Sequence, residues 1–341
     1  MNFARGRTFP MILILLANIA GWLHVLPVFV QLVINSSCCV YLGTIMSSKI
    51  FKSKNGEFGL SEKDKDAEHI GKKEALKFPV VASVFLFGFY IIYKYVNKDW
   101  VNFFITLQFC FATIISTSTI LEPVLPFPDP MRKVIQHVKP HRYLKSILDI
   151  TDFDISISSI IALLISTVPV VLYYITKYWA LNNVFGILFS IVALRNIHLT
   201  TFQVGFILLW LLFFYDIFWV YGTDVMVTVA KNLDIPIKLL FPYLNDEGEE
   251  KFSMLGLGDI VIPGIFISLC LKFDIDQCIK TKPKKFENFK IPYHTTSFIG
   301  YILGMGATFA AMYIFDHAQP ALLFLVPSCT ISVAIVALIR G

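Results

Sequence analysis

Long hydrophobic blocks separated by short polar segments make up most of this chain. The blocks run for about 17 to 25 residues, the length that an α-helix needs to cross a hydrocarbon layer about 30 Å thick. Nine blocks are candidate spans, at residues 26–46, 78–96, 101–121, 155–175, 179–194, 201–222, 257–273, 295–315 and 320–338. The pattern predicts an all-α membrane protein with nine transmembrane helices, formed by a single polytopic domain over residues 1–341.

The composition agrees with this prediction. Hydrophobic residues make up 56% of the chain and charged residues 16%, whereas about a quarter of an average soluble domain is charged. The net charge is +5, but the Lys and Arg residues lie between the apolar blocks, where membrane topology explains them better than nucleic acid binding does. We therefore expect the lipid bilayer as a partner and no nucleic acid.

The region before residue 47 has two interpretations. Residues 9–46 are apolar almost throughout, too long for one ordinary span and too short for two with a comfortable turn. Arg5 and Arg7 precede an apolar stretch as in a signal peptide, but Asn18 to Ala20 make a poor cleavage site. We predict one long or broken first helix, with residues 1–25 as a signal-like segment or an extension of that helix.

Positive charges are distributed unequally between the two sides of the predicted spans. One set of alternating connections contains 21 Lys and Arg residues and the other set contains 8. By the positive-inside rule the richer side faces the cytosol. This predicts a cytosolic loop at residues 47–77, a connection at residues 223–256 outside the cytosol, an N-terminus on that same outer side and a cytosolic C-terminus.

Asp216 is the first candidate catalytic residue. It follows Tyr215 in a span whose other residues nearby are aromatic or aliphatic. An Asp at the centre of a membrane helix costs about 2.5 to 3.5 kcal/mol, so an intramembrane carboxylate is a functional hypothesis by default. The alternative is an Asp that a neighbouring helix satisfies, or one that lies at the membrane interface.

Asp259 is the second candidate and lies near the start of the next apolar block. Gly256 and Gly258 precede it, and residues without a side chain allow another group to approach the backbone closely. Asp is also a favoured helix N-cap and Gly lets helices pack, so a structural role explains this acid equally well by itself.

Asp216 and Asp259 are more informative as a pair. They occupy consecutive spans of opposite direction, so they can face each other within the bilayer. Two carboxylates that share a site cannot both ionise at low cost, so the pair should hold one proton near neutral pH. The ionised partner can then activate water while the protonated partner hydrogen-bonds the scissile carbonyl.

A third element is the sequence Gln319-Pro320-Ala321-Leu322 at the start of the last block. Proline has no amide hydrogen, so it leaves a backbone carbonyl without its helical donor. A proline at the start of a helix is also common without any function. If a substrate helix unwinds before cleavage, its backbone needs new partners, and we predict two sources for them: carbonyls freed by Pro320 and the irregular stretch from Val225 to Phe241.

Three ordered motifs together resemble the presenilin and signal peptide peptidase superfamily of intramembrane aspartyl proteases, and the surrounding sequence is most similar to the signal peptide peptidase family. The motifs are Tyr215-Asp216, Gly256-Leu257-Gly258-Asp259 and Pro320-Ala321-Leu322. The resemblance implies a presenilin-like fold of nine spans, a luminal N-terminus, the endoplasmic reticulum membrane and catalysis by Asp216 and Asp259 without a metal or organic cofactor. It also implies substrate contacts from Tyr215, Gly256, Leu257, Gly258, Gln319, Pro320, Ala321 and Leu322.

Two departures separate the chain from presenilins. Presenilins have a long hydrophilic insertion between the aspartate helices, whereas residues 223–256 form a short connection here. The membrane orientation expected of presenilins is also opposite to the one that the charge count predicts.

The predicted function is hydrolysis of peptide bonds within transmembrane segments, chiefly signal peptide remnants and type II membrane helices. One alternative is a transporter or channel whose buried acids relay protons or bind cations. Another is a protein that binds membrane helices without cleaving them. Neither an HExxH zinc motif nor a GxSG serine motif occurs in the sequence. The sequence leaves open whether the chain forms a homo-oligomer.

Overall fold

The computed structural model describes residues 5–22, 26–47, 50–52, 58–60, 68–122, 125–132, 134–138, 153–223, 225, 229, 237–244, 250–281, 290–315 and 319–340. The α-helices in these residues are α1 (Arg5–Trp22), α2 (Val28–Ser47), α3 (Lys72–Tyr95), α4 (Lys98–Leu121), α6 (Ile157–Thr176), α7 (Trp179–Asn196), α8 (Phe202–Tyr221), α10 (Gly258–Thr281), α11 (Pro292–Phe315) and α12 (Leu322–Arg340). The strands are β1 (Ile50–Lys52), β2 (Phe58–Leu60), β3 (Glu68–Ile70), β4 (Val134–Val138), β5 (Phe153–Ser156), β6 (Ile197–Leu199), β7 (Lys238–Leu244) and β8 (Glu250–Gly256).

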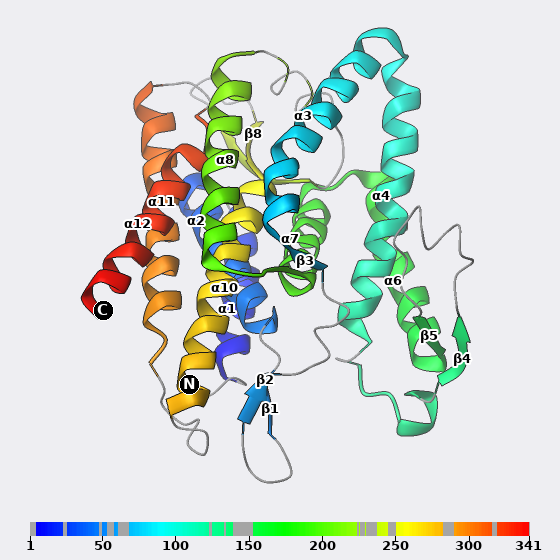
Figure 1. Cartoon of the computed structure of the whole chain (residues 1–341). Coiled ribbons are helices and arrows are strands. Elements are labelled where there is room, and N and C mark those ends of the chain that lie inside the picture. Colours follow the sequence, from blue (N-terminus) through cyan, green and yellow to red (C-terminus); the bar gives the residue numbers. More distant parts are fainter. Residues whose placement is uncertain are drawn as a thin grey trace.

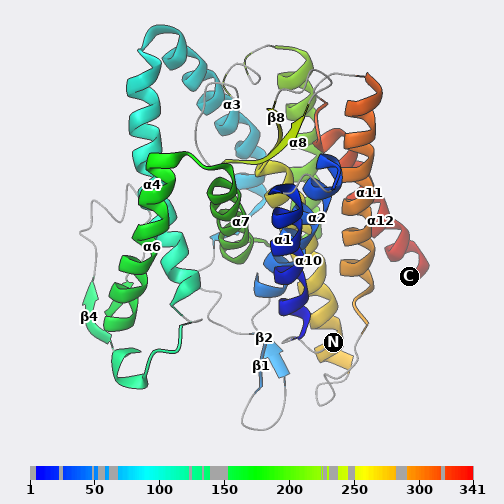
Figure 2. The same cartoon turned by 180° about the vertical axis from the view of Figure 1, so that it is seen from behind.

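The helices form a bundle in which α2 and α10 occupy the centre (Figures 1 and 2). Around them α2 packs against α1, α7 and α11, while α12 packs against α8 and α11. Helices α4 and α6 pack together on one side of the molecule, and α3 packs against both α4 and α8. The β7–β8 hairpin lies close to the start of α10 in both views.

Each of the nine predicted spans coincides with a helix, and seven of the helices in the described part of the chain are long and apolar enough to cross a membrane. These seven are α2, α3, α4, α6, α8, α11 and α12. Helix α7 contains Asn182 and Asn183, and α10 contains Lys272 and Asp274, which lower their hydropathy. The structure thus shows a mainly helical protein with seven candidate spans, and crossing by α7 and α10 stays a prediction.

The outer faces of α3, α4 and α6 consist of exposed apolar side chains. Val84 is 67% exposed, Phe111 is 62% exposed and Val168 is 70% exposed. Surfaces of this kind are rare on soluble monomers, and in a membrane protein they contact lipid. The three helices therefore present a lipid-facing surface, while the large buried residues gather around α2, α8 and α10.

Residues 9–46 form two helices, so the predicted first helix is broken and the chain reverses direction at the break. Asn18 Nδ2 on α1 donates to Asn35 Oδ1 on α2 over 2.9 Å, and Leu13 lies with Cys38 on one cavity wall, as an antiparallel pair requires. Arg5 and Ser47 consequently lie at the same end of the molecule. The charge count had placed residues 1–25 and 47–77 on opposite sides of the membrane, and the α1–α2 pair does not support that separation.

Small residues let α11 and α12 approach closely. A Cβ atom on Gly300 would lie 2.6 Å from the Ser328 carbonyl oxygen, and one on Gly304 would lie 3.0 Å from the Phe324 carbonyl oxygen. A Cβ on Gly306 would meet nothing within 4 Å. Gly300 and Gly304 therefore serve helix packing, and Gly306 takes no part in this contact. The tight contact fixes the start of α12 against α11.

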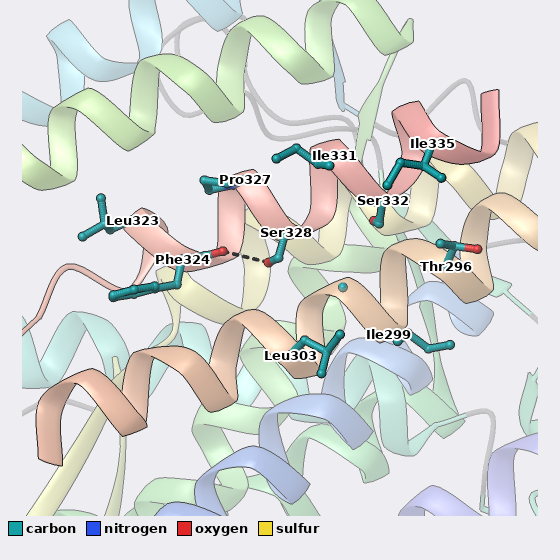
Figure 3. Close-up of a pocket in the computed structure, with 11 residues that line it drawn as sticks. Thr296, Ile299, Leu303, Leu323, Phe324, Pro327, Ser328, Ile331, Ser332 and Ile335 are labelled. Atoms are coloured by element: carbon teal, nitrogen blue, oxygen red, sulfur yellow. Dashed lines mark hydrogen bonds between the residues drawn. The ribbon is translucent and has the colours of Figure 1, made fainter. Parts of the chain in front are cut away.

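Beside this contact the two helices border a cavity of about 490 Å³ (Figure 3). Its walls are mainly apolar side chains, including Ile299 and Leu303 from α11 and Ile331 from α12. The Ser328 hydroxyl donates to the Phe324 carbonyl over 2.7 Å, so this polar group is satisfied within its own helix. The cavity is therefore an apolar surface feature that follows α12 from Leu323 to Ile335.

In the described part of the chain, four two-stranded sheets accompany the predicted helices. β1 pairs with β2, β4 with β5 and β7 with β8 in antiparallel fashion, and β3 pairs with β6 in parallel. The β7–β8 hairpin lies within residues 223–256 and covers part of the stretch from Val225 to Phe241 that was predicted to be irregular; most of residues 224–236 lie outside the described part of the chain. This hairpin leads directly into α10.

Candidate active site

Helix α8 carries Asp216 on its buried face. Thr201 starts the helix, since its hydroxyl accepts from the Val204 amide over 3.3 Å, as an N-cap residue does. The buried positions of α8 recur every three or four residues, and they are Val204, Gly205, Leu208, Leu209, Leu212, Asp216 and Trp219. Asp216 is 5% exposed and belongs to this buried helix face, whose other side chains are apolar. This acid therefore faces the protein interior, and its catalytic role stays a prediction.

Asp259 is the second residue of α10 and follows β8 after only two residues. The Leu257 amide donates to the Ile237 carbonyl over 2.9 Å, and the Leu257 carbonyl accepts from the Val261 amide over 2.9 Å. These bonds join the hairpin to the first turn of the helix. A Cβ atom on Gly256 would lie 3.4 Å from Asp259 Oδ2, so the glycine leaves space directly beside the carboxyl group.

The structure brings the two aspartates together. Helices α8 and α10 pack against each other, and the Asp216 and Asp259 carboxyl groups are close enough to interact electrostatically. Asp216 lies near the end of α8 and Asp259 at the start of α10, and the two helices run in opposite directions (Figure 1). Two carboxyl groups in one buried site form the arrangement that can share a proton.

The third motif meets the first in the same place. The Leu322 amide donates to Asp216 Oδ2 over 3.1 Å, although the two residues are far apart in the sequence. Pro320 and Ala321 are buried. The Pro320 carbonyl accepts from the Leu323 amide over 3.2 Å, so this carbonyl already serves α12. The carbonyls that Pro320 was predicted to free precede it in the chain, and residues 316–318 lie outside the described part.

Comparison with known proteins agrees with this geometry. The family model described as signal peptide peptidase matches residues 62–341. The signal peptide peptidase of Homo sapiens is 37% identical over 314 residues, which cover 89% of this chain and 78% of the human protein. That of Mus musculus is 40% identical over 286 residues, 80% of this chain and 72% of the mouse protein. A probable intramembrane protease of Schizosaccharomyces pombe is 31% identical over 281 residues, 82% and 83% of the respective chains.

The chain belongs to the signal peptide peptidase family. It is accordingly a multi-pass intramembrane protease, and the transporter alternative is not favoured. The resemblance stated from the three motifs is confirmed at the level of the family. The identity of the catalytic and substrate-binding residues was not tested by these matches and stays a prediction.

Other motif residues of this signal peptide peptidase family member occupy the surroundings of the two acids. Tyr215 is half-buried, packs its ring 6.3 Å from that of Trp219 and interacts electrostatically with Asp216. Gly258 is the first residue of α10 and Leu257 forms the turn before it. Gln319 does not contact either acid in the described structure; it accepts a hydrogen bond from the Tyr221 hydroxyl instead.

The sequence analysis did not predict a role for two residues of α7, Asn182 and Asn183. The Asn182 side chain donates to the Lys238 carbonyl over 2.7 Å. The Asn183 side chain donates to the Leu240 carbonyl and accepts from the Leu240 amide, both over 2.7 Å. Two adjacent amides inside an apolar block were an available signal, because polar side chains within membrane segments are expensive and need partners. Asn182 and Asn183 thus hydrogen-bond the backbone of β7 on the edge that faces away from β8.

Tyr301 also lies behind the site without having been predicted. It is fully buried on α11 and interacts electrostatically with Asp259. Among the described residues, no three His, Cys, Asp or Glu side chains are close enough to hold a metal ion. The polar groups that meet at the site are the two carboxyl groups and the Leu322 backbone amide.

Proposed function

We propose that this protease is an aspartyl enzyme in which Asp216 and Asp259 hydrolyse a peptide bond of a transmembrane substrate. The observation that supports this most directly is the convergence of three distant segments: a buried Asp216, its neighbour Asp259 and the Leu322 amide bound to Asp216 Oδ2. In this proposal one carboxylate accepts a proton from water while the other, protonated, donates to the scissile carbonyl. The tetrahedral intermediate then collapses as the leaving nitrogen takes up a proton.

The Leu322 amide has a defined part in this chemistry. The first amides of a helix have no acceptor within that helix. Donation by Leu322 to Asp216 Oδ2 occupies one carboxylate oxygen and orients the other. A hydrogen bond to an ionised carboxylate is stronger than one between neutral groups, so this contact favours a fixed position for the acid.

The substrates we propose are signal peptide remnants and similar type II membrane helices, and the compartment is the endoplasmic reticulum membrane. This extends to the chain what the name of the human and mouse relatives, signal peptide peptidase, says of those proteins. Cleavage of a purified model signal peptide in detergent, with products identified by mass spectrometry, tests the activity. Absence of products at any enzyme concentration, together with ion flux in liposomes, would instead support the transporter.

An unwound substrate can pair with the outer edge of β8. Both backbone groups of Leu240 bond to Asn183, so they point away from β8. Met254 lies directly opposite Leu240, and opposed residues in an antiparallel pair exchange either both hydrogen bonds or neither. The backbone groups of Met254 therefore point to the edge away from β7. Strand addition on this edge would lead the substrate along β8 to Gly256 and the adjacent Asp259.

The cleavage rate should depend on pH as a bell-shaped curve. At low pH both acids are protonated and no base remains to activate water, whereas at high pH both are ionised and none can donate to the carbonyl. Maximal kcat therefore lies between the two apparent pKa values of the pair, which belong to the dyad as a unit. Initial rates between pH 4 and 10 in one detergent measure the profile, and a rate that rises continuously into alkaline pH contradicts the shared proton.

The membrane orientation can be measured with tags in sealed microsomes. We expect added protease to digest a tag at residue 60 and to leave a tag at residue 246 protected, because residues 47–77 contain eight lysines and should face the cytosol. The opposite pattern would reverse the assignment. A third tag before Arg5 decides the N-terminus: protection supports the luminal prediction, and digestion supports the side that the α1–α2 pair implies.

A further inference from the structure

The segment Gln319–Leu322 is held at both ends by side chains of one helix. At one end the Leu322 amide donates to Asp216 Oδ2 over 3.1 Å. At the other end the Tyr221 hydroxyl donates to Gln319 Oε1. Asp216 and Tyr221 are five residues apart on α8, which is about 7.5 Å along the helix axis. Two contacts separated in this way fix the orientation of the segment as well as its position.

The segment forms the entry into α12, and Pro320 and Ala321 within it are buried. Gln319 and Pro320 lie outside any helix, and α12 begins at Leu322. Pro320 has no amide hydrogen with which to bind the surrounding protein. The way the chain enters α12 sets the direction of the Leu322 amide, and Gln319, three residues before Leu322, carries the side chain that hydrogen-bonds Tyr221 of α8.

We propose that Tyr221 is a positioning residue for cleavage, whose hydroxyl fixes Gln319 and thereby keeps the Leu322 amide on Asp216. This inference rests on the proposed catalytic role of Asp216. The bond has a second consequence, because it uses the oxygen of the Gln319 amide and directs the Nε2 group elsewhere. The two hydrogens on Nε2 can then donate to a carbonyl of the unwound substrate, which gives a physical basis for the predicted substrate contact of Gln319.

The test compares Tyr221→Phe, Gln319→Met and the double variant in the full-length enzyme. Tyr221→Phe removes only the hydroxyl, so kcat should fall about fivefold, the equivalent of one ordinary hydrogen bond. KM for a model transmembrane peptide should stay within about twofold, and the thermal midpoint should not change. Gln319→Met should reduce kcat at least as much and raise KM. The double variant should be no slower than Gln319→Met, because both changes break the same bond.

The matched control is Tyr313→Phe, an equally small change at a tyrosine on α11 that is 90% exposed. It should retain the rate of the unmodified enzyme. A Tyr221→Phe enzyme with full kcat overturns the proposal, as does a lower kcat that is accompanied by a lower thermal midpoint, or a double variant that is slower than Gln319→Met. If Tyr221→Phe does not fold, Gln319→Met replaces it in the test: a lower kcat with an unchanged thermal midpoint supports the proposal, and any other result overturns it. Activity that persists in Asp216→Asn would refute the aspartyl mechanism instead, so the two failures are distinguishable.

Discussion

Asp216→Asn and Asp259→Asn should each lose cleavage to the background level while the protein remains folded and inserted. The substitution keeps the size of the side chain and one oxygen but removes the ability to exchange a proton. General acid–base catalysis contributes about 10²–10⁴-fold to rate, so a loss of at least about a hundredfold is expected for either acid. Because the two groups act as a unit, the double variant should be no slower than the single ones.

The matched control for this experiment is Asp274→Asn. Asp274 is also buried and also on α10, but its carboxylate accepts from the His294 amide over 2.9 Å at the start of α11, far along the helix from Asp259. We expect this change to lower stability by about 1 kcal/mol, the value of one hydrogen bond, with activity per folded molecule retained. Turnover by a well-folded Asp216→Asn or Asp259→Asn enzyme would refute the dyad.

Features that depend on local sequence could be predicted. The span predicted at residues 26–46 is α2 at Val28–Ser47, and the span at 201–222 is α8 at Phe202–Tyr221. Both follow from the length of an apolar block, because a helix in lipid satisfies its own backbone. The proximity of Asp216 and Asp259 was also expected from the sequence, since consecutive elements of a chain are usually adjacent in space.

The features that were missed depend on distant partners. The stretch predicted to be irregular, from Val225 to Phe241, overlaps the first four residues of β7 at Lys238–Leu244. What makes it a strand is pairing with β8 and the bonds from Asn182 and Asn183, more than fifty residues earlier. The reversal between α1 and α2 was missed for a similar reason, since the Asn18–Asn35 bond appears only when the helices are side by side.

The contact between Tyr221 and Gln319 is another example of this limit. The two residues are 98 positions apart, and neither is unusual in its own segment. The motifs at Asp216 and Pro320 indicated that both segments belong to the site, but not which atoms meet. The hydrogen bond from the Leu322 amide to Asp216 Oδ2 supplies one such pair of atoms.

Cleavage should require an unwound substrate held on the outer edge of β8, and Met254→Pro should impair it strongly. In an intact helix the scissile carbonyl is hydrogen-bonded and covered by side chains, and unwinding it in lipid exposes backbone groups that need partners. Proline at position 254 removes an amide that points away from β7, so the hairpin keeps its own bonds. With one substrate bond lost, kcat/KM for a leucine-rich helix should fall about tenfold.

The comparison that isolates the backbone is Met254→Pro against Met254→Ala, since both remove the side chain but only proline removes the amide hydrogen. Three substrates with Leu, Gly or Pro near the cut then test the unwinding step. The Gly and Pro substrates should be cleaved faster than the Leu substrate by the unmodified enzyme, because they have less helix to lose. Equal rates for all three substrates, together with equal activity of the two Met254 variants, would contradict strand addition on β8 and leave the aspartyl chemistry untouched.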